Sequence, residues 1–203
     1  MYELLVLSLL MYWPLHAYRI AKIANEIIGP EDQVSTGTLS TLLNKLTQIG
    51  LITSVDPDMT PFASDRSSRV FALTPAGRER FFTLMLDTTS HPGNYRRIFR
   101  IKALHLELLP PESQIFLVEH YMAYCQQFIH SKQADVQDVS DHPLKQEHMQ
   151  PAFRQMALAL IQLKIEEWRL ELAWVQSLRT LVLARLQHPG EFITEDKNSH
   201  LPE

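Results

Sequence analysis

The chain has 203 residues, of which 45% are hydrophobic and 21% are charged, as is ordinary for a soluble globular protein. This length predicts one or two domains with a sizeable buried core. The net charge of -4 excludes a protein that coats nucleic acid through bulk positive charge, although a local basic face could still bind it. The single cysteine, Cys125, cannot form an intramolecular disulfide, which is typical of a reducing compartment.

The apolar residues at the start of the chain resemble the core of a signal peptide. However, Glu3 stands where such a peptide carries a basic residue, and residues 14–16 offer no small-residue cleavage site. The run is also much shorter than the roughly 20 apolar residues that span a membrane. We therefore expect a cytoplasmic protein.

Three short helices are predicted in the first fifty residues. The first covers residues 4–11 and ends before Pro14, and the second follows from Leu15 until Gly29 and Pro30 stop it. A polar turn leads to the third helix, residues 36–49, which Gly50 closes. Such close spacing predicts a compact three-helix unit.

After residue 50, the apolar residues no longer recur at helical spacing but alternate with polar residues. Residues 51–55 and 69–73 read as two strands joined by a loop rich in proline, aspartate and serine. Thr74 is a good N-cap for a following helix, because Pro75 suits the first helical position. Three helices, a two-stranded hairpin and another helix are the order of a winged helix-turn-helix.

The second half of the chain reads as helix. We predict a domain boundary at residues 90–94, helices over 95–109 and 112–136, a polar connection over 135–150 and a long helix over 151–187. The fold class is therefore mainly α: a winged helix-turn-helix domain (1–90), a helical dimerisation and effector domain (91–190) and a loose tail (191–203).

The long helix carries apolar residues on two faces, so it needs two partners. The helix from residue 112 can cover one face, and a second copy of the chain can cover the other. The alternative is a purely intramolecular three-helix bundle. The second set of apolar residues is Leu160, Leu163, Leu170, Trp174, Leu178 and Leu181. We assign the dimer contacts to Leu158, Ile161, Ile165, Trp168, Leu172, Val175 and Val182.

The third helix has a polar face without any acidic residue between Val34 and Ile49. In a helix-turn-helix the second helix of the motif enters the major groove, where Ser, Thr and Asn can bond phosphates and bases. Arginines at the end of the hairpin loop could clamp the DNA backbone. The alternatives are a solvated polar face and arginines paired with Asp58 or Asp65. The predicted DNA-binding residues are Lys22, Ser35, Thr36, Thr38, Ser40, Thr41, Asn44, Lys45, Arg66, Ser67, Ser68 and Arg69.

Four segments in this order resemble motifs of PadR-like transcriptional regulators, including the AphA-like members with a virulence-activator type C-terminal domain. They are PLHAYRI (14–20), VSTGTLS (34–40), LTQIGLI (46–52) and RVFALTPAG (69–77). The helical second half is similar in layout, at FRIKALHLELLPPESQ (99–114) and WRLELAWVQSLR (168–179).

The resemblance implies a cytoplasmic, dimeric, DNA-binding protein, usually a repressor that an effector releases. It adds Tyr18 as a contact to the DNA backbone and assigns dimerisation to residues 151–187. The chain departs from the family at residues 39–41, which lack the usual aromatic residue, and its wing is longer and less basic. These departures bear on the operator sequence and the affinity rather than on the fold.

Family members often respond to small aromatic molecules. An aromatic box with a cationic rim would suit an aromatic carboxylate, although packing of a core is the alternative reading. The residues for it are Tyr121, Tyr124, Trp168, Trp174, Arg97 and Arg100.

We expect neither a cofactor nor a metal site nor an enzyme, because the sequence has no paired cysteines, zinc-binding motif or phosphate loop. Cys125 reads as a small buried hydrophobe, with a thiol sensor as the alternative. The rival function is a winged-helix module that contacts proteins and has lost DNA binding.

Overall fold

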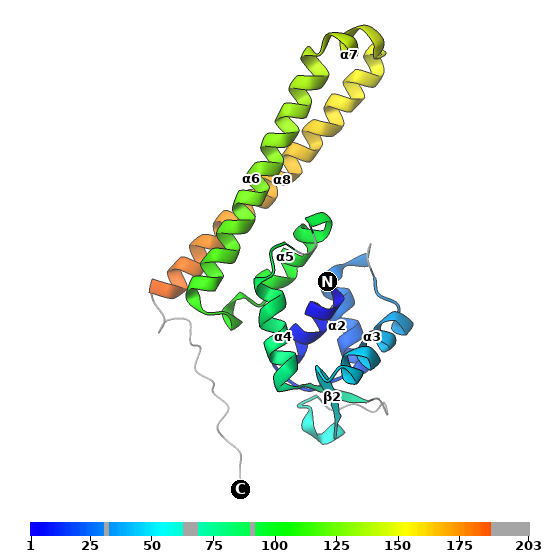
Figure 1. Ribbon diagram of the computed structural model, residues 1–203, viewed down its shortest axis with the longest axis vertical. Coiled ribbons are helices and arrows are strands. Elements are labelled where there is room, and N and C mark those ends of the chain that lie inside the picture. The colour runs from blue at the N-terminus through cyan, green and yellow to red at the C-terminus, as the bar shows by residue number, and fades with distance from the viewer. Residues whose placement is uncertain (31–32, 63–68, 90–91, 188–203) are drawn as a thin grey trace. The chain divides into compact units, whose positions relative to one another are not determined.

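The computed structural model describes residues 1–30, 33–62, 69–89 and 92–187 (Figure 1). It contains two compact units, Met1–Leu109 and Pro110–Glu203. The division therefore falls after Leu109, later than the boundary that we predict at residues 90–94. The reason is that residues of the segment after 94 pack in the first unit: Phe99 is fully buried, and the Lys102 ammonium donates a hydrogen bond to the Asp87 carbonyl.

The first unit has the element order of a winged helix-turn-helix, with one strand more than the sequence predicts. The two-residue strand β1 pairs antiparallel with β3, and β2 pairs with the other side of β3, giving the order β1-β3-β2. The elements are α1 (Tyr2–Leu10), β1 (Leu15–His16), α2 (Ala17–Ile28), α3 (Thr36–Gln48), β2 (Ile52–Val55), η2 (Pro57–Met59), β3 (Val70–Leu73), α4 (Pro75–Leu86), η3 (Pro92–Asn94), α5 (Tyr95–Ala103) and η4 (Leu106–Leu108).

The core of the first unit is built around α1. Every residue of this helix from Leu4 to Leu10 is buried, including Ser8, whose hydroxyl donates to the Leu5 carbonyl at 2.8 Å. Thr74 caps α4 as predicted, since its side-chain oxygen accepts a hydrogen bond from the Gly77 amide. An apolar first helix thus holds the other helices around it, and its lack of a polar face explains its resemblance to a signal peptide.

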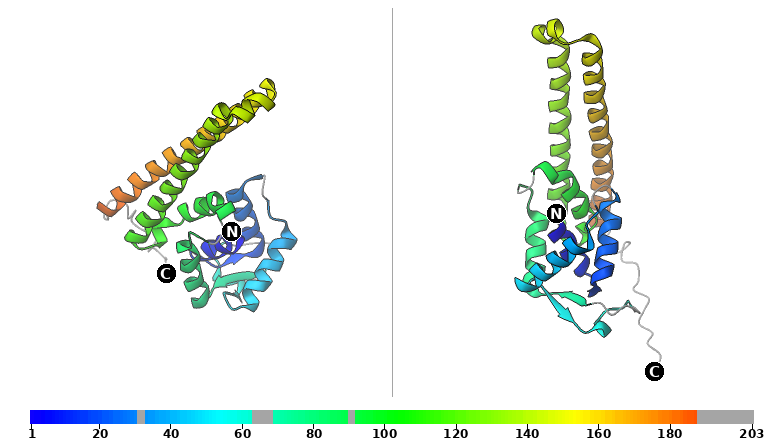
Figure 2. Two further views of the ribbon diagram at one scale, coloured as in Figure 1. Left: turned by 45° about the horizontal axis from the view of Figure 1, so that its top comes forward. Right: turned by 90° about the vertical axis from the view of Figure 1, so that its right-hand side faces the viewer.

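The second unit is a helical hairpin. Helices α6 (Pro111–Asp141) and α8 (Pro151–Gln187) run antiparallel and lie side by side in both figures, with the short α7 (Pro143–His148) at the turn between them (Figures 1 and 2). The polar connection predicted over residues 135–150 is wrong, because most of that segment is helical. It is polar since it faces solvent, and ion pairs join Lys132 to Asp135 and Lys145 to Asp138. In the described part of the chain, no helix is both long and apolar enough to cross a membrane.

Candidate nucleic-acid interface

Helix α3 is anchored at its start and along one side. Asn25 of α2 holds the preceding turn through two hydrogen bonds to the backbone of Val34, at 2.7 and 3.1 Å. The Ser35 hydroxyl caps the helix by accepting from the Thr38 amide at 3.1 Å. Leu39, Leu43 and Leu46 are buried on the core side. The opposite side of the helix must therefore face solvent.

The polar residues predicted for DNA binding lie on that exposed side of α3. Four of them also have structural partners. The Ser35 side chain caps the helix and lies 2.9 Å from Thr38 Oγ1, the Thr41 hydroxyl donates to the Gly37 carbonyl at 3.0 Å, and Asn44 Oδ1 accepts from Arg69. A hydroxyl bonded to its own helix still offers lone pairs to a donor outside it. The exposed residues are Ser35, Thr36, Thr38, Ser40, Thr41, Asn44 and Lys45.

Helix α2 adds a cation held between aromatic rings. The Arg19 Nε donates to the Tyr18 hydroxyl at 3.1 Å, and the guanidinium carbon lies 4.8 Å from the centre of the Phe62 ring. Stacking fixes a flexible side chain while leaving its charge in place. Lys22 is exposed one turn further on, and its ammonium is 4.0 Å from the Glu26 carboxylate. Arg19 and Lys22 are two of the five basic residues whose clustering on one face would favour DNA over the rival function, together with Lys45, Arg66 and Arg69.

Arg69, the residue immediately before β3, joins the sheet to α3. Its Nη2 donates to Asn44 Oδ1 at 3.0 Å, and its carbonyl accepts from the Ala17 amide at 3.0 Å. One residue thus links β3 to both α2 and α3. Arg66, Ser67 and Ser68, the other predicted wing contacts, lie outside the described residues. The cations of the candidate interface that the structure describes come from α2, α3 and the residue before β3: Arg19, Lys22, Lys45 and Arg69.

The residues predicted for an effector site are divided between the two units, the aromatic residues lying in the second and the arginines in the first. Tyr121 stacks on Tyr124, which meets Trp168 edge-on with the ring centres 5.6 Å apart, and the centre of the Phe128 ring lies 4.4 Å from that of Trp168. This row is part of the packing between α6 and α8. Trp174 is 40% exposed and lies elsewhere on α8, while Arg97 and Arg100 belong to α5 in the first unit.

The two apolar faces of α8 differ in what covers them. Ile165, Trp168, Val175 and Val182 are buried within the chain, and Trp168 contacts aromatic residues of α6. These are residues that we assigned to the dimer, so that assignment is corrected: their face packs on α6. The others of that set, Leu158, Ile161 and Leu172, are half-buried. The second apolar set stays exposed at Leu160, Leu163, Leu170, Trp174 and Leu181, as do Phe153 and Met156.

Tyr12, His105 and Glu107 form a polar cluster in the first unit that the sequence does not reveal. The Tyr12 hydroxyl donates to the Glu107 carboxylate and lies 3.0 Å from His105 Nδ1. His105 is 5% exposed, and its Nε2 has no hydrogen-bond partner among the described residues. Burial lowers the pKa of His105 and, together with Glu107, raises the pKa of Tyr12. More than 90 residues separate Tyr12 from its partners, so no local pattern indicates the cluster.

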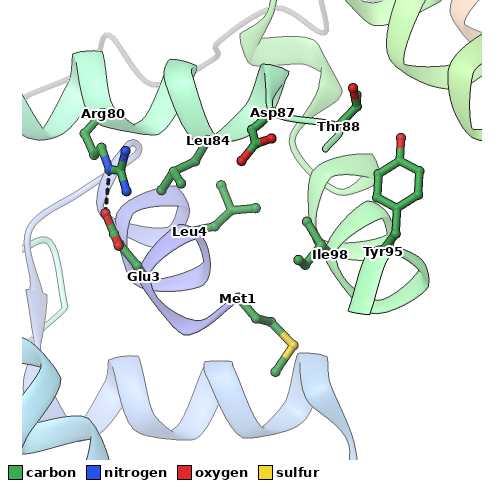
Figure 3. Close-up of a pocket in the computed structure, with 9 residues that line it drawn as sticks. All are labelled: Met1, Glu3, Leu4, Arg80, Leu84, Asp87, Thr88, Tyr95 and Ile98. Carbon is green, nitrogen blue, oxygen red and sulfur yellow. Dashed lines mark hydrogen bonds and ion pairs between the residues drawn. The ribbon is translucent and has the colours of Figure 1, made fainter. Parts of the chain in front are cut away.

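A small cavity of about 80 Å³ lies between α1, α4 and α5 (Figure 3). Leu4, Leu84 and Ile98 line its apolar part, and an ion pair between Glu3 and Arg80 at 2.7 Å closes one side. Its volume is below that of an engineered apolar cavity that binds benzene, about 150 Å³. Among the described residues, no group of three His, Cys, Asp or Glu side chains could hold a metal ion. Cys125 is fully buried in α6.

Comparison with known proteins gives a family match for the first unit. Residues 6–82 match the model of the transcriptional regulator PadR-like family. This span runs from within α1 into α4 and so includes α2, α3 and the whole sheet. No curated protein matches the chain by sequence.

Similar solved structures cover both units. Bacillus subtilis PadR in complex with operator DNA is 18% identical, with a TM-score of 0.39 and coverage of 89% of this chain and 98% of that chain. The same protein in complex with p-coumaric acid is 18% identical, with a TM-score of 0.37 and coverage of 89% and 97%. The Vibrio cholerae virulence activator AphA is 16% identical, with a TM-score of 0.38 and coverage of 91% and 99%. The match covers residues 6–82, which span the helix-turn-helix and its wing, so this part of the chain is a domain of the transcriptional regulator PadR-like type.

Proposed function

We propose that the protein is a homodimeric repressor that binds an operator in double-stranded DNA through α3 and the start of β3. The observation that carries this proposal is the exposed face of α3, which is polar and free of acidic residues while its opposite face is buried. Helix-turn-helix proteins place such a face in the major groove. Cations on α2, α3 and β3 would meet the phosphates on either side of the groove.

A gel-shift assay with the DNA upstream of the protein's own gene tests DNA binding. The wild type should shift this fragment at moderate salt, and Lys45→Ala should weaken binding by removing a phosphate contact. Lys164→Ala is the matched control, because Lys164 is an exposed cation of α8 that pairs with Glu167. Absence of binding to any fragment would favour the rival function, a module that contacts proteins.

The exposed face of α8 supports the dimer. Its apolar residues recur at spacings of three and four or their sum, as in the seam of a coiled coil, over more than four turns of helix. Leu170 is 75% exposed and Trp174 is 40% exposed, which is costly for large apolar side chains that stay in water. A second copy of α8, laid on this face, would bury them and present two copies of α3 to one DNA duplex.

The dimer can be tested by placing a charge on the seam. Leu170→Lys should convert a particle of about 47 kDa, twice the chain mass of 23.5 kDa, into a monomer in analytical ultracentrifugation. The new lysine can pair with Glu166 and Glu167 on the same helix, so the helix itself should persist. Gln176→Lys, also on α8 but off the seam, is the control and should remain dimeric. A monomeric wild type would contradict the dimer.

An aromatic carboxylate is the proposed effector. A groove of about 490 Å³ between α6 and α8 supports this, because His130, Ile165 and Arg169 line it. Ile165 and Arg169 flank Trp168 along α8, at the end of the aromatic row. Titration with p-coumaric acid should quench tryptophan fluorescence and raise the melting temperature of the wild type, but much less so in Arg169→Ala. Unchanged fluorescence together with an unchanged melting temperature would exclude this effector.

A further inference from the structure

We propose that Arg69 is a positioning residue for Asn44, so that the strand of the wing decides which base edge the recognition helix reads. This inference rests on the proposed function, in which α3 enters the major groove. It concerns one contact, the hydrogen bond of 3.0 Å from Arg69 Nη2 to Asn44 Oδ1. The two residues are 25 positions apart in the sequence, so only the fold brings them together.

The backbone of Arg69 is held in place by the sheet. Its carbonyl accepts a hydrogen bond from the Ala17 amide at 3.0 Å, and the next residue, Val70, pairs with both His16 and Val55. The guanidinium carbon also lies 5.5 Å from the centre of the Phe71 ring, and Phe71 is only 1% exposed. The fixed backbone and the contact with a buried ring together restrict the conformations that the Arg69 side chain can adopt.

Asn44 lies on the exposed side of α3. Its side chain is one turn after Ser40 and Thr41, within the polar face that carries the proposed DNA contacts. An unrestrained asparagine amide can turn either its oxygen or its nitrogen toward a base. A restraint on this amide would therefore restrict which base it can recognise.

The chemistry of the guanidinium removes that freedom. Arginine nitrogens only donate hydrogen bonds, so the amide atom that faces Arg69 must be the oxygen. With Oδ1 engaged, Asn44 presents its Nδ2 hydrogens outward. Such a donor suits the acceptors of guanine (O6 and N7) or thymine (O4), and with adenine it can make only the single contact to N7. The bidentate contact of asparagine with adenine also needs Oδ1 turned toward the adenine N6 amino group, and the hydrogen bond from Arg69 holds Oδ1 in another direction. Arg69 should therefore steer Asn44 away from adenine.

The experiment selects binding sites from a library of duplexes with a randomised central segment. It compares the full-length wild type with Asn44→Ala, Arg69→Ala and the double variant. The wild type should prefer a guanine or thymine at one position of the selected site. That preference should disappear in Asn44→Ala, and Arg69→Ala should shift it toward adenine by about fivefold or more. The double variant should match Asn44→Ala at this position.

Lys45→Ala is the matched control, since Lys45 is the neighbouring exposed cation of α3. It should lower the affinity for all selected sequences without changing the base preference, as loss of a phosphate contact does. If Arg69→Ala behaves in the same way, Arg69 is a phosphate clamp and the positioning role is wrong. If the wild type selects no sequence, the proposed function fails and the inference falls with it. Thermal melting checks that the variants are folded.

Discussion

Gly77 is a residue at which the fold leaves no room for a side chain. A Cβ atom there would lie 2.0 Å from the Leu51 carbonyl oxygen and 2.8 Å from a methyl group of Leu73. The crowding arises because Thr74 donates to the carbonyls of Gly50 and Leu51 and accepts from the Gly77 amide. These hydrogen bonds hold the first turn of α4 against Gly50 and Leu51, which follow α3.

Gly77→Ala should lower the free energy of unfolding by about 1–3 kcal/mol, the usual range for overpacking. The measurement is urea denaturation of the full chain. Gly93→Ala is the control, because a Cβ there meets nothing within 4 Å, and it should change stability by less than about 0.5 kcal/mol. Equal stability of the two variants would mean that α4 is not drawn onto Leu51 in solution.

His105 gives the first unit a dependence on pH. Burial lowers its pKa below the ordinary value of 6.5, and Tyr12 and Glu107 are the titratable groups that contact it or its partner. As pH falls below about 6.5, the unfolded chain takes up a proton that the folded chain resists. Stability should therefore fall between pH 6.5 and the lower pKa of the folded state, by about 1.4 kcal/mol for each unit between the two pKa values.

Urea denaturation at pH 7.5, 6.0 and 5.0 measures this effect as a difference between the wild type and His105→Gln. Other groups titrate equally in both proteins, so they cancel in the comparison. The wild type should lose more stability than the variant on going to pH 5.0. Parallel curves for the two proteins would show that His105 is protonated as easily in the folded state as in the unfolded state.

At the scale of elements, local patterns predicted most of the first unit. The helices, both strands of the hairpin and the Thr74 cap follow from apolar period and capping residues. The two-residue β1 was missed because its existence depends on pairing with β3, which lies more than 50 residues away. The Arg69 contact with Asn44 and the Tyr12 cluster have the same origin, since each depends on residues that only the fold brings together.

The second unit shows a different limit of sequence patterns. Polarity alone predicts a polar connection over residues 135–150, although a polar segment can equally form a solvated helix, as the end of α6 and α7 do here. For α8 the pattern revealed two apolar faces but could not tell which of them meets α6. Which face of α8 packs on α6 depends on the side chains of α6, including Tyr124 and Phe128, which contact Trp168.

A buried polar contact joins α6 to α8 and can be tested by itself. The Tyr121 hydroxyl donates to the Glu171 carboxylate at 2.9 Å, and both residues are buried. Tyr121→Phe should lower the free energy of unfolding by about 1–3 kcal/mol, because it leaves a buried carboxylate with one donor fewer. Glu171→Gln keeps an oxygen acceptor and should cost less. Wild-type stability of Tyr121→Phe in urea would show that this hydrogen bond contributes nothing.

For the whole molecule, the effect of the net charge of -4 on DNA binding depends on how the charges are distributed over the surface. A dimer would carry -8, twice the charge of one chain, yet α3 has no acidic residue, and Lys22, Lys45 and Arg69 are exposed cations on or beside it. Bulk charge therefore opposes nonspecific binding, while the local face favours phosphate contacts. We expect binding that is selective and sensitive to salt, and that depends on a few cationic side chains.

Footprinting of the protein on a DNA site selected from the randomised library tests the central claim most directly. A dimer with two copies of α3 should protect two half-sites on one face of the duplex. Their centres should be separated by about one helical turn, roughly 10 base pairs, or by a whole multiple of it. Leu170→Lys should protect these half-sites only at much higher protein concentration. A single protected half-site, or uniform protection along the duplex, would contradict a dimeric protein that reads its operator through α3.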